Sequence, residues 1–210
     1  MSKSASKKLF LFDFDGTLTK SDSFMDFLKF TQPQWRFALG AALLSPILLA
    51  YKLKLLDNHT AKQKVTAFFF KNTPLKAFQQ GCNQFAASVI PLILKEGVDA
   101  YLQALTQKKG VEVCLVSASF ENYLQAWCNQ YGIRCMGTQL AVESGQLTGS
   151  FDGKNCYGLE KVNRIKAVYS LQDYDEIYAF GDTPGDFPML ELVPKANRFY
   201  KPDFTREKLP

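Results

Sequence analysis

The order of apolar and polar positions predicts strands that alternate with helices. The run Lys8–Phe14 is apolar up to an acidic, glycine-containing turn, a pattern typical of a parallel strand buried on both faces. Beyond residue 97, helical segments alternate with expected strands at Val111–Ser117, Arg134–Ala141, Glu176–Phe180 and Ala196–Phe199. The alternation predicts an α/β fold with a doubly wound, Rossmann-like parallel sheet.

A long helical segment separates the first strand from the second. From Asp22 to about Leu94 the apolar periodicity is helical. The pattern is broken at Pro33, Pro46, Asp57-Asn58, Pro74 and Pro91. Because the segment is too long for a simple crossover, we expect a separate helical cap. The predicted domains are an α/β core over 1–19 and 95–210 and an inserted cap over 20–94.

One stretch of this cap, residues 37–51, carries no charge. It is shorter than the roughly 20 apolar residues that a bilayer span needs, and Pro46 interrupts it. Arg36, Lys52 and Lys54 flank it. Two interpretations stay open: a helix packed within the cap, or an interfacial helix that makes peripheral membrane contact through residues 36–56.

Charge and cysteine content narrow the class of protein. The net charge is +5, and residues 20–94 hold nine Lys or Arg against three Asp. This excess indicates either a solvated helix surface or a surface that faces a phosphorylated substrate or an acidic lipid. The cap lacks the basic runs and arginine–aromatic alternation typical of nucleic-acid binding. Five cysteines without a C-x-x-C pair favour reduced, buried thiols.

The beginning of the chain is basic and precedes an apolar run, as in a signal peptide. That run, however, leads directly into Asp13 and Asp15, which a secretory apolar region does not tolerate. We therefore expect a cytoplasmic protein, or one peripheral to the inner face of the membrane.

Two acidic motifs follow predicted strands. Asp13 and Asp15 stand in D-F-D-G-T, and Asp182 and Asp186 stand in G-D-T-P-G-D. Ligands of open α/β sheets bind at the carboxyl ends of the strands, so all four carboxylates should meet at one edge. A calcium loop of the EF-hand type is disfavoured because its twelfth position is Phe24 rather than Glu. An oxygen-only cluster of this kind suits Mg²⁺.

Two further residues carry weaker signals. Ser117 ends a predicted strand, where its hydroxyl and the amides that follow, including that of Ala118, could bind a phosphoryl oxygen. Lys161 begins a predicted helix, and a single lysine at such a position does not by itself indicate a function.

Taken in order, these motifs resemble the haloacid dehalogenase superfamily, in particular its phosphoserine-phosphatase-like branch (subfamily IB). The D-x-D-G-T motif, the Ser after an apolar strand, the Lys and the final G-D-x(3)-D are all present. The long helical cap and the stretch 143–149 (ESGQLTG) are similar to that branch.

The resemblance implies a phosphatase mechanism. Asp13 would attack phosphorus to form an aspartyl-phosphate, and Asp15 would act as general acid and base. Mg²⁺ would be held by the Asp13 carboxylate, the Asp15 carbonyl and Asp182, with Asp186 in support. The phosphoryl group would be bound by Thr17, Ser117, Ala118 and Lys161. A dehalogenase has no leaving alkoxide to protonate and lacks the second Asp, so dehalogenation is disfavoured.

The resemblance implies that residues of the cap select the substrate. At the positions where phosphoserine phosphatases carry Glu and Arg, this chain has Asp22 and Lys64, which disfavours phosphoserine because Lys does not reproduce the bidentate fork of Arg. The substrate is expected to be a phosphorylated small molecule or a lipid head group. The apolar cap segment resembles that of phosphatidylglycerophosphate phosphatases. A phosphotransferase and a catalytically silent binding module remain alternatives, the latter disfavoured by the complete motif set.

Overall fold

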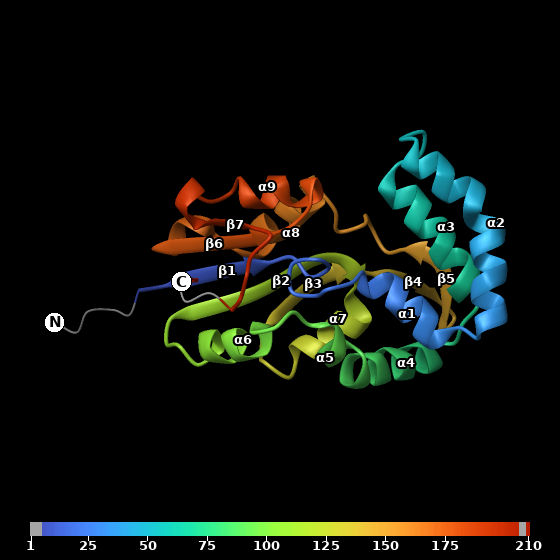
Figure 1. Ribbon diagram of the computed structural model, residues 1–210, viewed down its shortest axis with the longest axis horizontal. Helices are drawn as coiled ribbons and strands as arrows, with labels where there is room; N and C mark the ends of the chain where they lie inside the picture. Colours follow the sequence, from blue (N-terminus) through green and yellow to red (C-terminus); the bar gives the residue numbers. More distant parts are fainter. Residues whose placement is uncertain (1–5, 206–208) are drawn as a thin grey trace.

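The computed structural model describes residues 6–205 and 209–210. Residues 1–5 and 206–208 of the predicted core lie outside these ranges. Five strands form one parallel sheet in the order β3-β2-β1-β6-β7. Their bounds are β1 Lys8–Phe12, β2 Val111–Phe120, β3 Arg134–Thr138, β6 Glu176–Gly181 and β7 Arg198–Tyr200. The predicted doubly wound α/β fold is confirmed (Figure 1).

The central strand β1 is buried on both faces, as its apolar run predicts. Phe10 and Phe12 point into a core formed with α6 (Val98–Thr106) and α7 (Glu121–Cys128). Leu9 and Leu11 point into a second core, formed with α8 (Leu159–Val168) and α9 (Phe187–Leu190). Figure 1 shows these helix pairs on opposite sides of the sheet. Three 3-10 turns complete the α/β unit, η1 Leu171–Asp173, η2 Pro184–Asp186 and η3 Lys195–Asn197.

The segment between β1 and β2 is helical. Its helices are α1 Ser23–Thr31, α2 Gln34–Lys52, α3 Asn58–Phe70, α4 Leu75–Ser88 and α5 Ile90–Ile93. Asp22 and Asp57 cap α1 and α3, because each side chain accepts a hydrogen bond from a first-turn amide. Phe27 of α1 lies at the centre of an aromatic cluster. Its ring contacts those of Phe70, Phe78, Phe85, Phe120 and Tyr123.

The predicted break at Pro46 is wrong, because α2 runs through it. A proline inside a helix removes the hydrogen bond to the carbonyl four residues earlier, here that of Ala42. The Ser45 hydroxyl donates to that carbonyl at 2.7 Å and so replaces the missing donor. The other predicted breaks coincide with helix boundaries.

The expected strand at 134–141 is divided. Its first part is β3, whereas β4 (Leu140–Glu143) pairs with β5 (Gln146–Phe151) in a separate hairpin. This hairpin packs against α3, with the Asn72 amide donating to the Leu147 carbonyl at 2.8 Å. In Figure 1 it lies with α2 and α3, away from the sheet. The hairpin therefore packs on a helix of the predicted cap, although its own residues lie outside 20–94.

Helix α2 is only partly covered. Gly40 and Leu44 are buried, and a side chain at Gly40 would collide with the Phe69 ring. The opposite side, here called the α2 outer face, exposes Trp35, Leu39, Leu43 and Leu49. In the part of the chain that the structure describes, no helix is long and apolar enough to cross a membrane.

Candidate active site

The first acidic motif forms the tight turn that follows β1. The Asp13 amide donates to the Phe180 carbonyl of β6 at 2.9 Å, which fixes the carboxylate at the sheet edge. Gly16 has a φ of +75°, and a Cβ atom there would lie 2.2 Å from Oδ2 of Asp182. Glycine is therefore required at this position, both for the turn and for the approach of the second motif.

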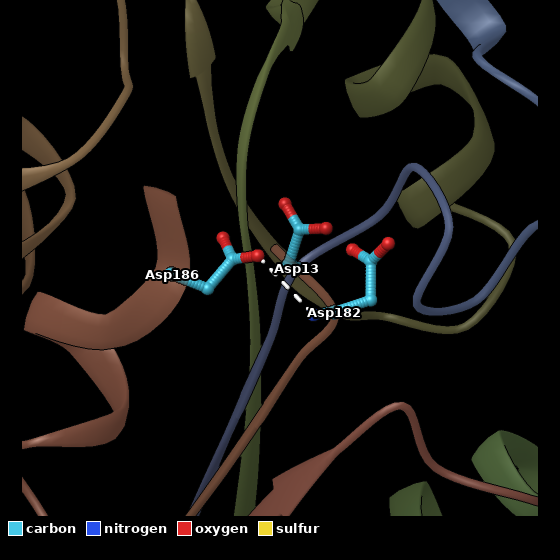
Figure 2. Close-up of side chains that lie close together, drawn as sticks. All are labelled: Asp13, Asp182 and Asp186. Carbon is cyan, nitrogen blue, oxygen red and sulfur yellow. Dashed lines mark hydrogen bonds between the residues drawn. The ribbon is translucent and has the colours of Figure 1, made fainter. Parts of the chain in front are cut away.

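Three of the four carboxylates that were predicted to meet at this edge come together here, and Asp15 is not among them. Oxygen atoms of Asp13, Asp182 and Asp186 all lie within 4.8 Å of one another (Figure 2). The Thr17 hydroxyl links two of them, because its single proton is shared between Asp13 at 3.1 Å and Asp182 at 3.2 Å. Thr17 is fully buried, so its hydroxyl orients the carboxylates.

Lys161 joins this cluster from α8. Its Nζ lies 2.5 Å from Asp13 and 2.6 Å from Asp186, and only 1% of the side chain is exposed. Burial alone would lower the pKa of Lys161, but the two carboxylates reverse the effect and raise the pKa above its usual value. The lysine is therefore a fixed positive charge beside Asp13.

The acids differ in their electrostatics. Burial raises the pKa of Asp13 to about 7, although Lys161 opposes the shift. Burial also works to raise the pKa of Asp186, but Lys161 and the hydrogen bonds of Thr183 hold it below its usual value. Burial raises the pKa of Asp182. A further cation beside Asp13 and Asp182 would favour their ionised forms.

The carboxylate oxygens of Asp13 and Asp182 therefore fit Mg²⁺ as ligands. Asp186 is already saturated, because one oxygen accepts from Lys161 and the other from the amides of Asp182 and Thr183 and the Thr183 hydroxyl. Asp13 and Asp182 are less occupied, with Thr17 as the hydrogen-bond donor to Asp182. These two carboxylates are the candidate direct ligands, and Asp186 fixes the lysine and the loop behind them.

Ser117 and Asp15 line a cavity that also contains Asp13, Asp186 and Lys161 in its lining. The Ser119 amide donates to the Ser117 hydroxyl at 3.1 Å, which leaves the Ser117 proton free to bind a ligand oxygen. Asp15 accepts hydrogen bonds from the Ser23 amide at 2.6 Å and the Ser119 hydroxyl at 2.5 Å. Burial raises the pKa of Asp15, and the charge of Asp22 adds to the effect.

Of the two predicted cap residues, one lines the cavity and the other does not. Asp22 lines the cavity. Lys64 is exposed and does not line it; Lys62, two residues earlier on α3, does. The Lys62 Nζ donates to the Ala118 carbonyl at 2.8 Å and lies over the Phe24 ring. Burial lowers the pKa of Lys62, an effect that Asp15 and Asp22 oppose. Sequence reasoning missed this lysine.

The cavity above the acids has a volume of about 450 Å³ and two unlike ends. Its floor is polar and carries Asp13, Asp15, Asp186, Ser117 and both lysines. Its walls are apolar and come from α1, α2 and α3, including Leu28, Phe37, Leu44, Leu48 and Phe69. Such a space accommodates a charged group at the sheet edge and an apolar group between the helices.

A family model for haloacid dehalogenase-like hydrolases matches residues 10–191, and the chain belongs to this family. Protein CicA of Caulobacter vibrioides is 34% identical over 190 residues, covering 88% of this chain and 82% of that protein. Histidinol-phosphatase of Neisseria meningitidis serogroup C is 26% identical over 201 residues, covering 89% and 87%.

Solved structures share the fold. A protein of unknown function from Bordetella pertussis Tohama I aligns with a TM-score of 0.77 at 23% identity, covering 90% of this chain and 88% of that one. A phospho-aspartyl intermediate analogue of phosphoserine phosphatase aligns with a TM-score of 0.60 at 20% identity, covering 90% and 84%. The expected likeness to phosphoserine phosphatase is thus confirmed at the level of the fold.

Proposed function

We propose that this chain is a Mg²⁺-dependent phosphatase that hydrolyses a phosphomonoester through an aspartyl-phosphate on Asp13. The observation that carries the proposal is the placement of Asp13 between Lys161 and Thr17 at the floor of the cavity. A carboxylate held on both oxygens beside a buried cation is oriented for nucleophilic attack.

The proposed reaction has two steps. In the first, an Asp13 oxygen bonds to phosphorus while the bond from phosphorus to the leaving oxygen breaks, and Asp15 gives that oxygen a proton. In the second, water gives its proton to Asp15 and bonds to phosphorus, and the bond to Asp13 breaks. Ser117, the Ala118 amide and Lys161 offset the phosphoryl charge.

The chain's own groups would hold the metal. Asp13, Asp182 and the main-chain carbonyl of Asp15 would be the Mg²⁺ ligands, with Asp186 holding Lys161 beside them. When bound, Mg²⁺ would supply positive charge to the phosphoryl oxygens.

Trapping of the covalent intermediate tests this proposal. Protein mixed with radiolabelled p-nitrophenyl phosphate and Mg²⁺, then quenched in acid, should retain label that hydroxylamine removes. The Asp13→Asn variant should retain none, because an amide is not a nucleophile at phosphorus. Equal labelling of both proteins would exclude Asp13 as the attacking group.

A lipid phosphate is the substrate class that the cavity favours. Its apolar walls suit a leaving group with an apolar body, and α2 both lines the cavity and forms the α2 outer face. Arg36 and Lys52 lie in the first and last turns of this helix, Lys54 follows it, and no acidic residue occurs over 27–56. These features support peripheral contact with an anionic membrane through residues 36–56, and a substrate of the phosphatidylglycerophosphate type.

Vesicle flotation tests the membrane contact. The protein should float with phosphatidylglycerol vesicles at low salt, and high salt should release it. Substitution of Lys52 and Lys54 by Glu should abolish flotation. The same changes at the exposed Lys108 and Lys109, which lie after α6, serve as the matched control. Absence of flotation at low salt would contradict this part of the proposal.

A further inference from the structure

Asp15 is the end of a buried chain of hydroxyl groups. The Ser119 hydroxyl donates to Asp15 at 2.5 Å, and the Ser23 hydroxyl donates to that of Ser119 at 3.2 Å. The Tyr123 hydroxyl lies 3.0 Å from that of Ser23. Because each hydroxyl has one proton and those of the two serines are engaged, Tyr123 is the donor in the last contact. The three donors therefore form one series directed at the carboxylate.

The surroundings of this series are apolar. Ser23, Ser119 and Tyr123 all have 0% exposure, and the Tyr123 ring contacts the rings of Phe27 and Phe85. Burying a hydroxyl among aromatic rings is costly unless it is hydrogen-bonded, and phenylalanine or alanine would fill the same space without that cost. Packing alone therefore gives no reason for three hydroxyls here.

The three donors come from different parts of the fold. Ser23 begins α1 of the helical insertion, Ser119 lies near the end of β2, and Tyr123 lies on α7. The Ser23 amide holds the other oxygen of Asp15 at 2.6 Å. The plane of the carboxylate is thus fixed by one anchor from the insertion and one from the sheet.

We infer that Ser119, supported by Ser23 and Tyr123, is a positioning residue that holds the Asp15 carboxyl group toward the leaving oxygen. The inference rests on the proposed function, in which Asp15 protonates that oxygen. Hydrogen bonds to both oxygens restrict rotation of the carboxyl group, so its proton is presented in one direction. Without Ser119, the group is held on one side only.

The dependence of rate on the leaving group tests this role. An alkoxide needs a proton as it leaves, whereas p-nitrophenolate is stable without one, so formation of the aspartyl-phosphate depends strongly on Asp15 only for the alkyl phosphate. Because kcat/KM reports this step and not the later hydrolysis, kcat/KM of Ser119→Ala should fall at least tenfold more for n-butyl phosphate than for p-nitrophenyl phosphate. Tyr123→Phe, which keeps the ring and so protects the fold, should show the same preference at about threefold.

Two variants serve as controls. Tyr101→Phe removes a tyrosine hydroxyl that donates to the Pro210 carbonyl, and Ser88→Ala removes one that donates to Gln84, both outside the cavity lining. Neither should alter the ratio of the two rates. Circular dichroism and thermal melting establish that each variant is folded.

The outcomes separate this inference from the function on which it rests. Equal losses for both substrates, or no loss in Tyr123→Phe and Ser119→Ala, would overturn the positioning role while the wild type remains a phosphatase. If the wild type hydrolyses neither substrate, the proposed function fails first, and the inference fails with it.

Discussion

Replacement of Lys161 by Met should destabilise the fold, independently of any catalytic effect. The lysine is almost fully buried and bonds two carboxylates at 2.5 and 2.6 Å. Removing it leaves Asp13 and Asp186 close together in a buried site without their cation. Breaking a buried ion pair by removing one partner costs about 3–5 kcal/mol, because the remaining charge is uncompensated. For a chain of this size each kcal/mol lowers Tm by about 2–4 °C, so a decrease of roughly 6–20 °C is expected.

Urea unfolding followed by circular dichroism measures this cost. The experiment is done at neutral pH in EDTA, so that a divalent cation does not replace the lysine charge. Lys166→Met, an exposed position on the same helix, is the matched control and should change the free energy of unfolding by less than about 0.5 kcal/mol. The slope of the free energy against urea should be the same in all variants, which shows that the same transition is compared.

A second variant distinguishes electrostatics from lost packing. In Lys161→Met combined with Asp186→Asn, one of the two uncompensated charges is absent. The double variant should therefore lose less stability than the sum of the single variants, and this coupling should exceed about 1 kcal/mol. A loss in Lys161→Met as small as in Lys166→Met, or strict additivity with Asp186→Asn, would show that Lys161 does not compensate these buried charges.

Three other expectations concern the metal, the core and the thiols. Asp182→Ala should raise the Mg²⁺ concentration for half-maximal activity by tenfold or more; an unchanged titration would contradict its role as ligand. Phe27→Ala should cost about 3–5 kcal/mol in urea unfolding, since the ring is fully buried among five others. Burial raises the pKa of Cys156 to about 11 and of Cys114 to about 12, so thiolate is scarce at pH 8. An aromatic disulfide reagent should therefore titrate all five thiols only after unfolding; fast reaction of more than Cys135, the partly exposed one, would contradict this.

The position of the acidic motifs at one edge of the sheet could be predicted because each motif directly follows its strand in the sequence. The apolar runs of β1 and β6 end immediately before Asp13 and near Asp182, so strand position alone places both motifs at the same edge. The parallel pairing of β1 with β6 then brings the carboxylates together. For Lys161 the family resemblance was needed, because a lysine at the start of a helix has no distinguishing local pattern.

The cap contact was predicted at the wrong lysine. Ala61, Val65 and Phe69 form the buried stripe of α3, and Lys62 lies nearer to this stripe than Lys64 does. Helical periodicity could have selected Lys62 over Lys64, whereas matching to a position in the family could not. The difference matters because a shift of two residues moves a side chain to the other side of a helix.

Other features depend on contacts that a linear reading does not reveal. The continuation of α2 through Pro46 depends on one hydroxyl, that of Ser45, in the right rotamer. The series from Tyr123 to Asp15 joins residues about 100 positions apart, so no spacing rule indicates it. The packing of the hairpin β4–β5 on α3 is likewise a tertiary contact.

The most direct test of the central claim is Mg²⁺-dependent release of inorganic phosphate, with wild type and Asp13→Asn compared side by side. The panel comprises p-nitrophenyl phosphate, phosphoserine, sugar phosphates, nucleotides and phosphatidylglycerophosphate, each with and without EDTA and with an added acceptor alcohol. The wild type should release phosphate only when Mg²⁺ is present, Asp13→Asn should release none, and the rate should be highest on the lipid phosphate. Release that survives in Asp13→Asn, or transfer to the alcohol without phosphate release, would contradict the central claim.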